Sequence, residues 1–191
     1  MLTHEYTPLS EDEYLRLEAR SPVRHEYLNG EVFAMTGGTL RHNAIALNIA
    51  SALRLHLRST SCRAFLNDVR VRVKSPNAYY YPDVLVSCGP GMQSLDAEAS
   101  TIVDPVLLIE VLSITTEATD RREKLLAYRT LPSLSEYALV SQDKARVEIH
   151  RRRGDIGWEL VEYSGIEPVH FNCVDLTLEM RDIYEGVSID G

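Results

Sequence analysis

The chain has 191 residues, of which 45% are hydrophobic and 25% charged, the balance of an ordinary soluble globular protein. This length fits one domain that can bury a sizeable core without metal or disulfide staples. We therefore expect a single domain over residues 1–191, in which a metal would serve chemistry rather than folding. Twenty Lys and Arg against 28 Asp and Glu give a net charge of -8, which is unfavourable for binding nucleic acid through a basic face.

The sequence has no pattern of export or of membrane insertion. Its first residues lack a basic region followed by an apolar stretch, and no apolar run approaches the roughly 20 residues of a membrane span. The three cysteines, Cys62, Cys88 and Cys173, are odd in number and show no C-x-x-C spacing. Free thiols therefore fit better than a disulfide framework or a zinc site, and we expect a cytoplasmic protein without a membrane partner.

The N-terminal part predicts a helix followed by a hairpin. Ser10 and Glu13 form a capping box, so a short helix should cover residues 10–20. Asn29-Gly30 lies between two strand-like runs and is a strong signal for a tight β-hairpin. Helix and hairpin together would occupy residues 10–36, before the core of the domain.

The next segment alternates between helical and strand patterns. Apolar residues at helical spacing predict a long helix over residues 40–58. From residue 62 to 74 the period changes to two, with three valines on one side and basic residues on the other. Residues 79–88 read as a further strand, and a loop follows over 89–100.

A continuous apolar run over residues 106–113 predicts a strand that is covered on both faces. A helix should follow over about 117–129, with residues 113–116 able to cap it and Pro132 beyond its end. Three more strands are expected at 135–141, 145–152 and 158–164, the last two joined by a turn at 154–157. This order favours a mixed α/β fold, a β-sheet with one long helix near each face.

Two acidic residues interrupt apolar strands. Asp83 follows Pro82 at the start of one strand, and Glu110 lies within VLLIEVL, where the pattern requires a hydrophobic residue. An ionised carboxylate is expensive to bury unless it is paired or bound to a metal. A salt bridge to an arginine would also explain Glu110, and a turn-capping role would explain Asp83 alone. Together the two acids indicate a cation site.

The helix after Glu110 carries Asp120, Lys124 and Tyr128 on one face. If that face lies over the end of the strand, Lys124 could supply positive charge to a scissile phosphate or orient a water. The alternative is a solvent-exposed pair of Asp120 and Lys124 at spacing i, i+4.

Several motifs of this chain occur in the same order in one known family. They are HEYLNGEVFAMTGGTLRHNAIALNI at 25–49, NDVRVRV at 67–73, PDV at 82–84, EVLSITTEATDRREKLLAYRTLPSLSEYALVSQDKARVEIHRR at 110–152 and DIYEGV at 182–187. On these motifs the sequence resembles the Uma-type family of restriction endonucleases, abundant in cyanobacteria and part of the PD-(D/E)xK nuclease superfamily. The resemblance covers nearly the whole chain.

The resemblance implies an α/β (α+β) fold with a restriction-endonuclease-like central mixed β-sheet flanked by helices. It also implies an endonuclease that hydrolyses phosphodiester bonds of DNA with Mg²⁺ or Mn²⁺, and a homodimer by analogy with enzymes that cut both strands. Asp83 and Glu110 match the two acids, and with the backbone carbonyl of Val111 they would hold the metal. The usual lysine two residues after the second acid is absent, because the position is Leu112. In the Uma-type pattern the lysine lies on the next helix, at Lys124.

Further residues lie in family-like motifs, each with a simpler explanation. Glu31 could be an additional acid or merely a solvated hairpin residue. His42 could contact phosphate or act as a base, or could be a structural group at a helix start. Asp68 is as compatible with a turn as with a ligand. Candidate contacts to a nucleic-acid backbone are the basic alternation Arg70, Arg72 and Lys74 and the run Arg151-Arg152-Arg153, although a solvated strand face explains the former equally well.

Two other functions remain compatible with the sequence. The acidic balance and Leu112 favour a catalytically silent nuclease fold that is used as a binding or assembly module. A metal-dependent hydrolase with another substrate is also possible, since a fold does not determine its substrate.

Overall fold

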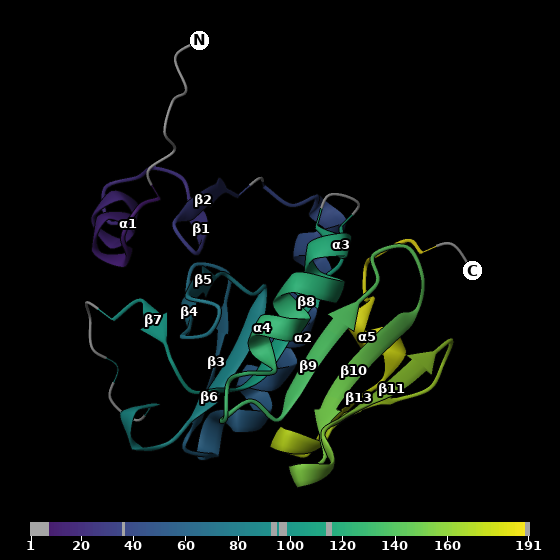
Figure 1. Cartoon of the computed structure of the whole chain (residues 1–191). Coiled ribbons are helices and arrows are strands. Elements are labelled where there is room, and N and C mark those ends of the chain that lie inside the picture. The colour runs from purple at the N-terminus through teal and green to yellow at the C-terminus, as the bar shows by residue number, and fades with distance from the viewer. Residues whose placement is uncertain (1–7, 36, 93–94, 96–98, 114–115, 190–191) are drawn as a thin grey trace.

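The computed structural model describes residues 8–35, 37–92, 95, 99–113 and 116–189. Its main β-sheet has six strands in the order β11-β10-β9-β8-β6-β3 (Figure 1). These strands are β3 (Cys62–Leu66), β6 (Val84–Cys88), β8 (Pro105–Val111), β9 (Glu136–Val140), β10 (Arg146–Arg152) and β11 (Trp158–Ser164). Neighbours are antiparallel except β8 and β9, which run parallel, so the sheet is mixed as expected.

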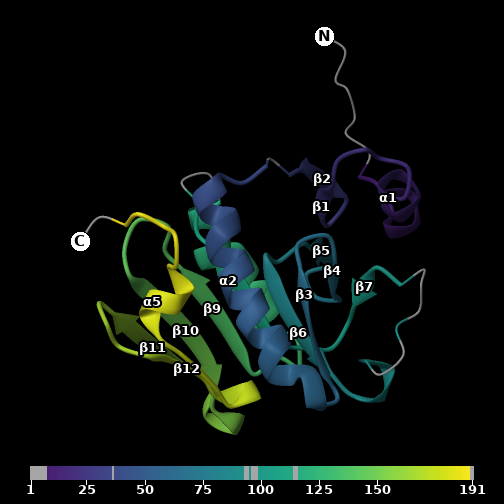
Figure 2. The same ribbon diagram turned by 180° about the vertical axis from the view of Figure 1, so that it is seen from behind.

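Helices cover the two faces of this sheet. The long helix α2 (Leu40–His56) crosses one face, and the short elements α3, η3 and α4 follow one another over the other (Figures 1 and 2). Alternation along the strands explains the arrangement, because Val84 and Ile109 pack in the core beneath α2 whereas Leu85 and Leu108 pack with Tyr128 of α4. The predicted α/β fold with a flanked central sheet is thus confirmed.

A second sheet of five strands stands beside the first, in the order β2-β1-β5-β4-β7. Its strands are β1 (His25–Leu28), β2 (Glu31–Ala34), β4 (Arg70–Val73), β5 (Ala78–Tyr80) and β7 (Thr101–Ile102). Helix α1 (Glu11–Glu18) packs on it through Tyr14, whose ring centroid lies 4.9 Å from that of Tyr27 and 5.2 Å from that of Tyr79.

The β1–β2 hairpin turns at Asn29-Gly30, as expected. Both residues have positive φ, 49° and 98°, the conformation of the tight turns that match strand twist. A Cβ atom on Gly30 would lie 2.3 Å from Cβ of Pro8, so only glycine fits between the turn and the chain ahead of α1. The Ser10–Glu13 capping box at the start of α1 is also present.

Two predicted strands are each divided between the sheets. The run 62–74 is broken at Asn67, whose φ of 52° turns the chain from β3 in the main sheet to β4 in the second. The run 79–88 is broken around Pro82, which has no N–H to continue a ladder, so β5 and β6 belong to different sheets. These crossings place Asp83 at the junction of the two sheets.

The predicted helix 117–129 has three parts: α3 (Glu117–Thr119), the π-helical segment η3 (Asp120–Lys124) and α4 (Leu125–Tyr128). Single π-helical turns inside helices are rare, and those that do occur are often found at functional sites. Residue 36 of the predicted hairpin, parts of the predicted 89–100 loop and residues 114–115 before this helix lie outside the described residues.

The remaining short elements complete the described chain. They are η1 (Leu57–Ser59), η2 (Pro90–Met92), η4 (Gly154–Ile156), β12 (Val169–Phe171), η5 (Asn172–Val174), β13 (Leu176–Leu178) and α5 (Met180–Ile183). The turn expected at 154–157 is the one that joins β10 to β11. Among the described residues, no helix has the length and apolar character to cross a membrane.

The expectation of three free thiols is wrong. Cys62 and Cys88 are disulfide-bonded across β3 and β6, and only Cys173 is a free cysteine in the described part of the chain. The antiparallel register sets Cys62 opposite Cys88, a proximity that their spacing of 26 residues does not reveal.

Thiol titration checks this disulfide. The unfolded, unreduced protein should expose one reactive thiol, from Cys173, and reduction should expose those of Cys62 and Cys88 as well. Reduction should also lower the free energy of unfolding by about 3 kcal/mol, because the bond closes a loop of 26 residues. Three reactive thiols before reduction would contradict the pairing.

The buried pair of Glu136 and Arg151 provides a test of the main sheet. Arg151 Nε lies 2.6 Å from Glu136 Oε1, and both residues are buried. Arg151→Met should lower the free energy of unfolding by roughly 3–5 kcal/mol, because the carboxylate stays buried without its cation. Arg153→Met, which removes the exposed pair with Glu159, should lower it by less than about 1 kcal/mol. Urea denaturation followed by Trp158 fluorescence compares the two, and equal losses would show that burial does not matter here.

Candidate functional site

A cleft of about 980 Å³ opens where the start of α2, the start of β6, the end of β8 and the start of the α3–η3 helix meet. Acidic and basic side chains gather in it from distant parts of the chain. They include Arg24, Arg41, His42, Asp68, Asp83, Glu110, Asp120, Arg121, Lys124, Asp143 and Lys144. The predicted acids and the predicted lysine therefore share one cavity.

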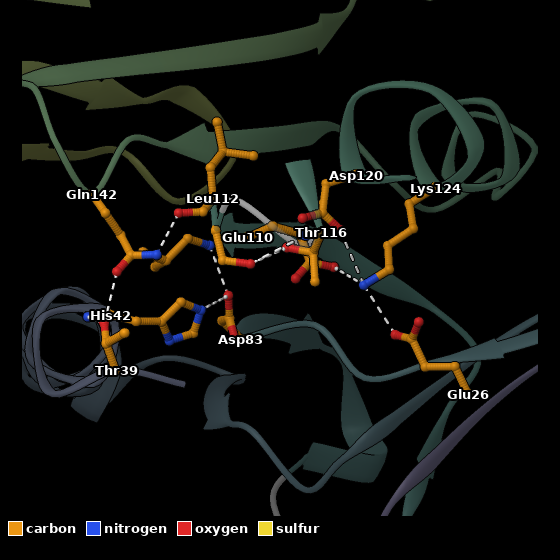
Figure 3. A network of polar contacts seen from close by, with 12 residues as sticks. Glu26, Thr39, His42, Asp83, Glu110, Leu112, Thr116, Asp120, Lys124 and Gln142 are labelled. Carbon is orange, nitrogen blue, oxygen red and sulfur yellow. Dashed lines mark hydrogen bonds and ion pairs between the residues drawn. The ribbon is translucent and has the colours of Figure 1, made fainter. Parts of the chain in front are cut away.

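Asp83 lies directly before β6, next to the end of β8. Its Oδ2 accepts a hydrogen bond of 2.7 Å from the backbone N–H of Val111, and Nε2 of His42 lies 3.1 Å from the same oxygen (Figure 3). The side chain is 15% exposed, so the carboxylate is held in place yet still reaches the cleft. Val84, the residue after Asp83, pairs with Ile109, the residue before Glu110, and the charge of Asp83 acts on Glu110, so the two acids are close neighbours.

Glu110 points away from the α2 face and toward the second helix. It is 3% exposed, and its Oε1 lies 3.2 Å from Nζ of Lys124 and 3.3 Å from the hydroxyl of Tyr128. It shares this side of β8 with Leu108, two residues earlier, because alternate residues of a strand face the same way. The sequence left a salt bridge to an arginine as the simpler explanation of Glu110, but the cation that pairs with it in the structure is Lys124.

Lys124 is surrounded by three carboxylates. Its Nζ lies 2.9 Å from Glu26 Oε1, 3.2 Å from Glu110 Oε1 and 3.2 Å from Asp120 Oδ1 (Figure 3). Lys124 and Asp120 are buried, so the exposed surface pair that was the alternative for these residues does not form. Asp120 Oδ1 is at ion-pair distance but accepts no hydrogen bond among the described residues, which leaves a buried oxygen incompletely satisfied.

This crowding of acids changes the ionisation of the site. Burial raises the pKa of Glu110 well above its ordinary value; Lys124 opposes the rise, and the charges of Asp120, Asp83 and Glu26 add to it. Burial acts to lower the pKa of Lys124, but Glu110, Glu26 and Asp120 together raise it well above its ordinary value. Lys124 thus stays an ammonium ion, while Glu110 holds a proton more readily than a solvated glutamate.

The other predicted site residues separate into two groups. Asp120, Tyr128 and His42 contact the group around Asp83 and Glu110. Glu31 is exposed on β2 and lies outside the residues that line the cleft. Asp68 reaches the rim of the cleft, where its exposed carboxylate pairs with Arg24 at 3.3 Å.

The basic residues of β4 do not line the cleft. Arg72 is held by Glu11 at 2.6 Å and stacks over Tyr79, and Arg70 donates to Ser100 and Thr101. Of the run Arg151–Arg153, the first residue is buried against Glu136, and Arg152 donates to backbone carbonyls such as Leu134 O. These guanidinium groups are used within the fold, because the side chains lie between packed elements rather than on a free strand face.

Two residues of the site were missed from the sequence. Glu26 belongs to the N-terminal hairpin, where a glutamate in a half-polar strand gives no sign of a buried partner. Gln142 is buried, accepts a hydrogen bond from Thr39 and donates to the carbonyl of Leu112. Only its position two residues after β9, which runs parallel to β8, could have suggested that it lies beside the end of β8.

The lysine can be tested by its effect on stability. Lys124→Met should lower the free energy of unfolding at neutral pH by roughly 3–5 kcal/mol, since three carboxylates lose their shared cation. Lys144→Met, which alters an exposed lysine of the same cleft, should change it by no more than about 0.5 kcal/mol.

The loss in Lys124→Met should also depend on pH. The folded-state pKa of Glu110 is raised, so the stability that its proton contributes is present below the ordinary pKa of 4.5 and is lost as the pH rises through the raised value. Without Lys124 that pKa rises further, and the deficit relative to the wild type should grow between pH 5 and pH 8. Urea unfolding at both pH values measures it; a deficit that is independent of pH would contradict the contact.

The chain is similar to a known protein family and to two cyanobacterial proteins. Residues 11–181 match the family model Uma2, described as "Putative restriction endonuclease". Two proteins of Synechocystis sp. (strain ATCC 27184 / PCC 6803 / Kazusa) are similar: "Uncharacterized protein slr1290", 30% identical over 96% of this chain and 95% of that protein, and "Uncharacterized protein sll1609", 32% identical over 82% and 88%.

A solved structure shares the fold. The crystal structure of "a putative nuclease belonging to DUF820" from Anabaena variabilis ATCC 29413 has a TM-score of 0.75 at 20% sequence identity, and the match covers 93% of this chain and 98% of that one. The family match extends over most of the chain, from α1 to the first residues of α5. The chain is therefore a member of the Uma2 family.

Proposed function

We propose that this protein is a metal-dependent endonuclease that hydrolyses phosphodiester bonds of DNA, with Asp83, Glu110 and Lys124 as its catalytic residues. The observation that carries the proposal is the meeting of two acids from neighbouring strands, in an open cleft, with a buried ammonium group 3.2 Å from one of them. Membership of the Uma2 family supports a nuclease role.

The donor set fits Mg²⁺ or Mn²⁺. In the part of the chain that the structure describes, no group of three or more His, Cys, Asp and Glu side chains could by itself hold a metal ion. Mg²⁺ does not require such a group, since it is usually bound through one or two carboxylates and keeps several waters. Asp83, Glu110 and the backbone carbonyl of Val111 would supply hard oxygen ligands of this kind.

The electrostatics also favour a cation. Burial raises the pKa of Glu110, the charges of Asp120, Asp83 and Glu26 add to the rise, and the buried Asp120 Oδ1 accepts no hydrogen bond from the residues that the structure describes. An added positive charge would relieve both effects. When bound, a divalent cation would neutralise charge on the phosphate and acidify a nearby water.

Lys124 acts in this scheme as a donor and not as a base. Its raised pKa keeps the amine protonated, so it cannot accept a proton from water. Its position beside Glu110 lets it hold that carboxylate in one orientation and add positive charge where the transition state gathers negative charge. The absence of a lysine at Leu112 is then compensated by a side chain from the neighbouring helix.

A homodimer is part of the proposal, because two sites are needed to cut both strands of a duplex. A second candidate function is a nuclease fold that only binds. It is favoured by the three carboxylates that already neutralise Lys124 and by the lack of a complete ligand group among the described residues.

Cleavage assays of Glu110→Gln test the endonuclease. The substitution keeps the shape of the side chain but removes the negative charge that would hold a cation. Cleavage of plasmid and single-stranded DNA in Mg²⁺ or Mn²⁺ should therefore fall by roughly 100-fold or more. Loss of a residue that only hydrogen-bonds to a metal ligand typically costs less, about 10–100-fold. Glu31→Gln, in the exposed acid of β2, is the matched control and should cut like the wild type.

Calorimetry with Mn²⁺ separates the two candidates. An endonuclease should bind Mn²⁺ at a site that Asp83→Asn and Glu110→Gln both weaken. A wild-type protein that neither binds Mn²⁺ nor cuts DNA would leave the binding module as the better account. Undiminished cleavage by Glu110→Gln would remove the assigned mechanism.

A further inference from the structure

His42 is the one histidine in the cleft, among the residues that the structure describes, and the proposed reaction leaves it without a role. Its side chain is 16% exposed, and its Nε2 lies 3.1 Å from Asp83 Oδ2 (Figure 3). The same oxygen accepts the backbone N–H of Val111 at 2.7 Å. Two N–H groups from different elements therefore meet at one oxygen of a proposed metal ligand.

Hydrogen bonds hold the first turn of α2 in a position that keeps the His42 imidazole beside Asp83. Thr39 caps the helix by accepting the backbone N–H of His42 at 3.1 Å, and its hydroxyl donates to Gln142 at 2.9 Å. Gln142 in turn donates to the carbonyl of Leu112 at 2.6 Å, directly after β8. The helix start and the end of β8, which carries Val111, are thus joined through one buried amide (Figure 3).

The backbone next to the ring also fits it closely. A Cβ atom on Gly38 would lie 2.8 Å from Nδ1 of His42 and 3.2 Å from its Cγ. A larger residue at position 38 would therefore push the imidazole out of its place. Glycine here leaves the ring the space that its contact with Asp83 requires.

We propose that His42 is a positioning residue for Asp83: its Nε2–H holds Oδ2, together with the N–H of Val111, and thereby leaves Oδ1 for the cation. This inference rests on the proposed metal-dependent function. Hydrogen-bonded partners of this kind orient ligating carboxylates, and their loss typically weakens metal binding about 10–100-fold.

Two substitutions separate the hydrogen bond from the packing of the ring. His42→Phe keeps a planar ring beside Gly38 but has no N–H, whereas His42→Gln keeps an N–H donor without the ring. Calorimetry with Mn²⁺ on the full-length chain should show binding about 10–100-fold weaker in His42→Phe, and close to the wild type in His42→Gln. His56→Phe, near the other end of α2, where Nε2 contacts the carbonyl of Val174, should bind like the wild type.

Each contrary result has a distinct meaning. Wild-type affinity in His42→Phe would overturn the proposal, and tighter binding would overturn it by showing that His42 competes with the cation. Equal weakening in both variants would show that the imidazole itself is a ligand or that its packing matters, again against the proposal. A wild-type protein that binds no Mn²⁺ would instead refute the metal-dependent function, and the inference with it. Thermal melts without metal confirm that each variant is folded.

Discussion

A single ammonium group, that of Lys124, connects the two sheets of this protein. Its carboxylate partners come from the hairpin of the second sheet (Glu26), from the main sheet (Glu110) and from the π-helical segment (Asp120). Removing one member of such a buried group would leave charges without compensation in a poorly solvated place. The hairpin, the sheet and the helix therefore cannot separate without exposing or stranding charge, and the geometry of the cleft follows from this constraint.

The acids around Lys124 outnumber the basic groups beside them. Four acids (Glu26, Asp83, Glu110 and Asp120) lie near one lysine and one histidine, and burial together with the charges of the other three acids raises the pKa of Glu110. A stable core would favour fewer acids here. Local costs of this kind concentrate at functional sites, where the surrounding fold maintains an arrangement that a ligand or cation then stabilises.

Much of the fold could be predicted from the sequence, because it depends on local patterns. The capping box at Ser10, the Asn29-Gly30 turn and the helical spacing after residue 40 each act over a few residues, and Glu110 is conspicuous because it interrupts an apolar run. The rest depends on pairing between distant strands. Pro82 marks a break in one predicted strand, but nothing local shows that its two halves join different sheets. The disulfide of Cys62 with Cys88 arises from strand register. The approach of Glu26 to Lys124, which lie 98 positions apart in the chain, depends on how the two sheets pack, and it leaves no local signal either.

The net charge of -8 is a weaker argument against a polyanionic substrate than it first suggests. The cleft contains arginines, and their partners at the rim are solvent-exposed acids: Asp68 for Arg24 and Asp143 for Arg41. Exposed pairs of this kind contribute roughly 0–1 kcal/mol, so a phosphate oxygen could replace either carboxylate at little cost. Arg121 differs, because it is held by two hydrogen bonds of 2.7 and 2.9 Å to the buried Glu148, and charge-assisted pairs with two parallel bonds are strong. The exchangeable positive charge of the cleft therefore lies at its rim, while the acids at its base repel a phosphate unless a cation is bound between them.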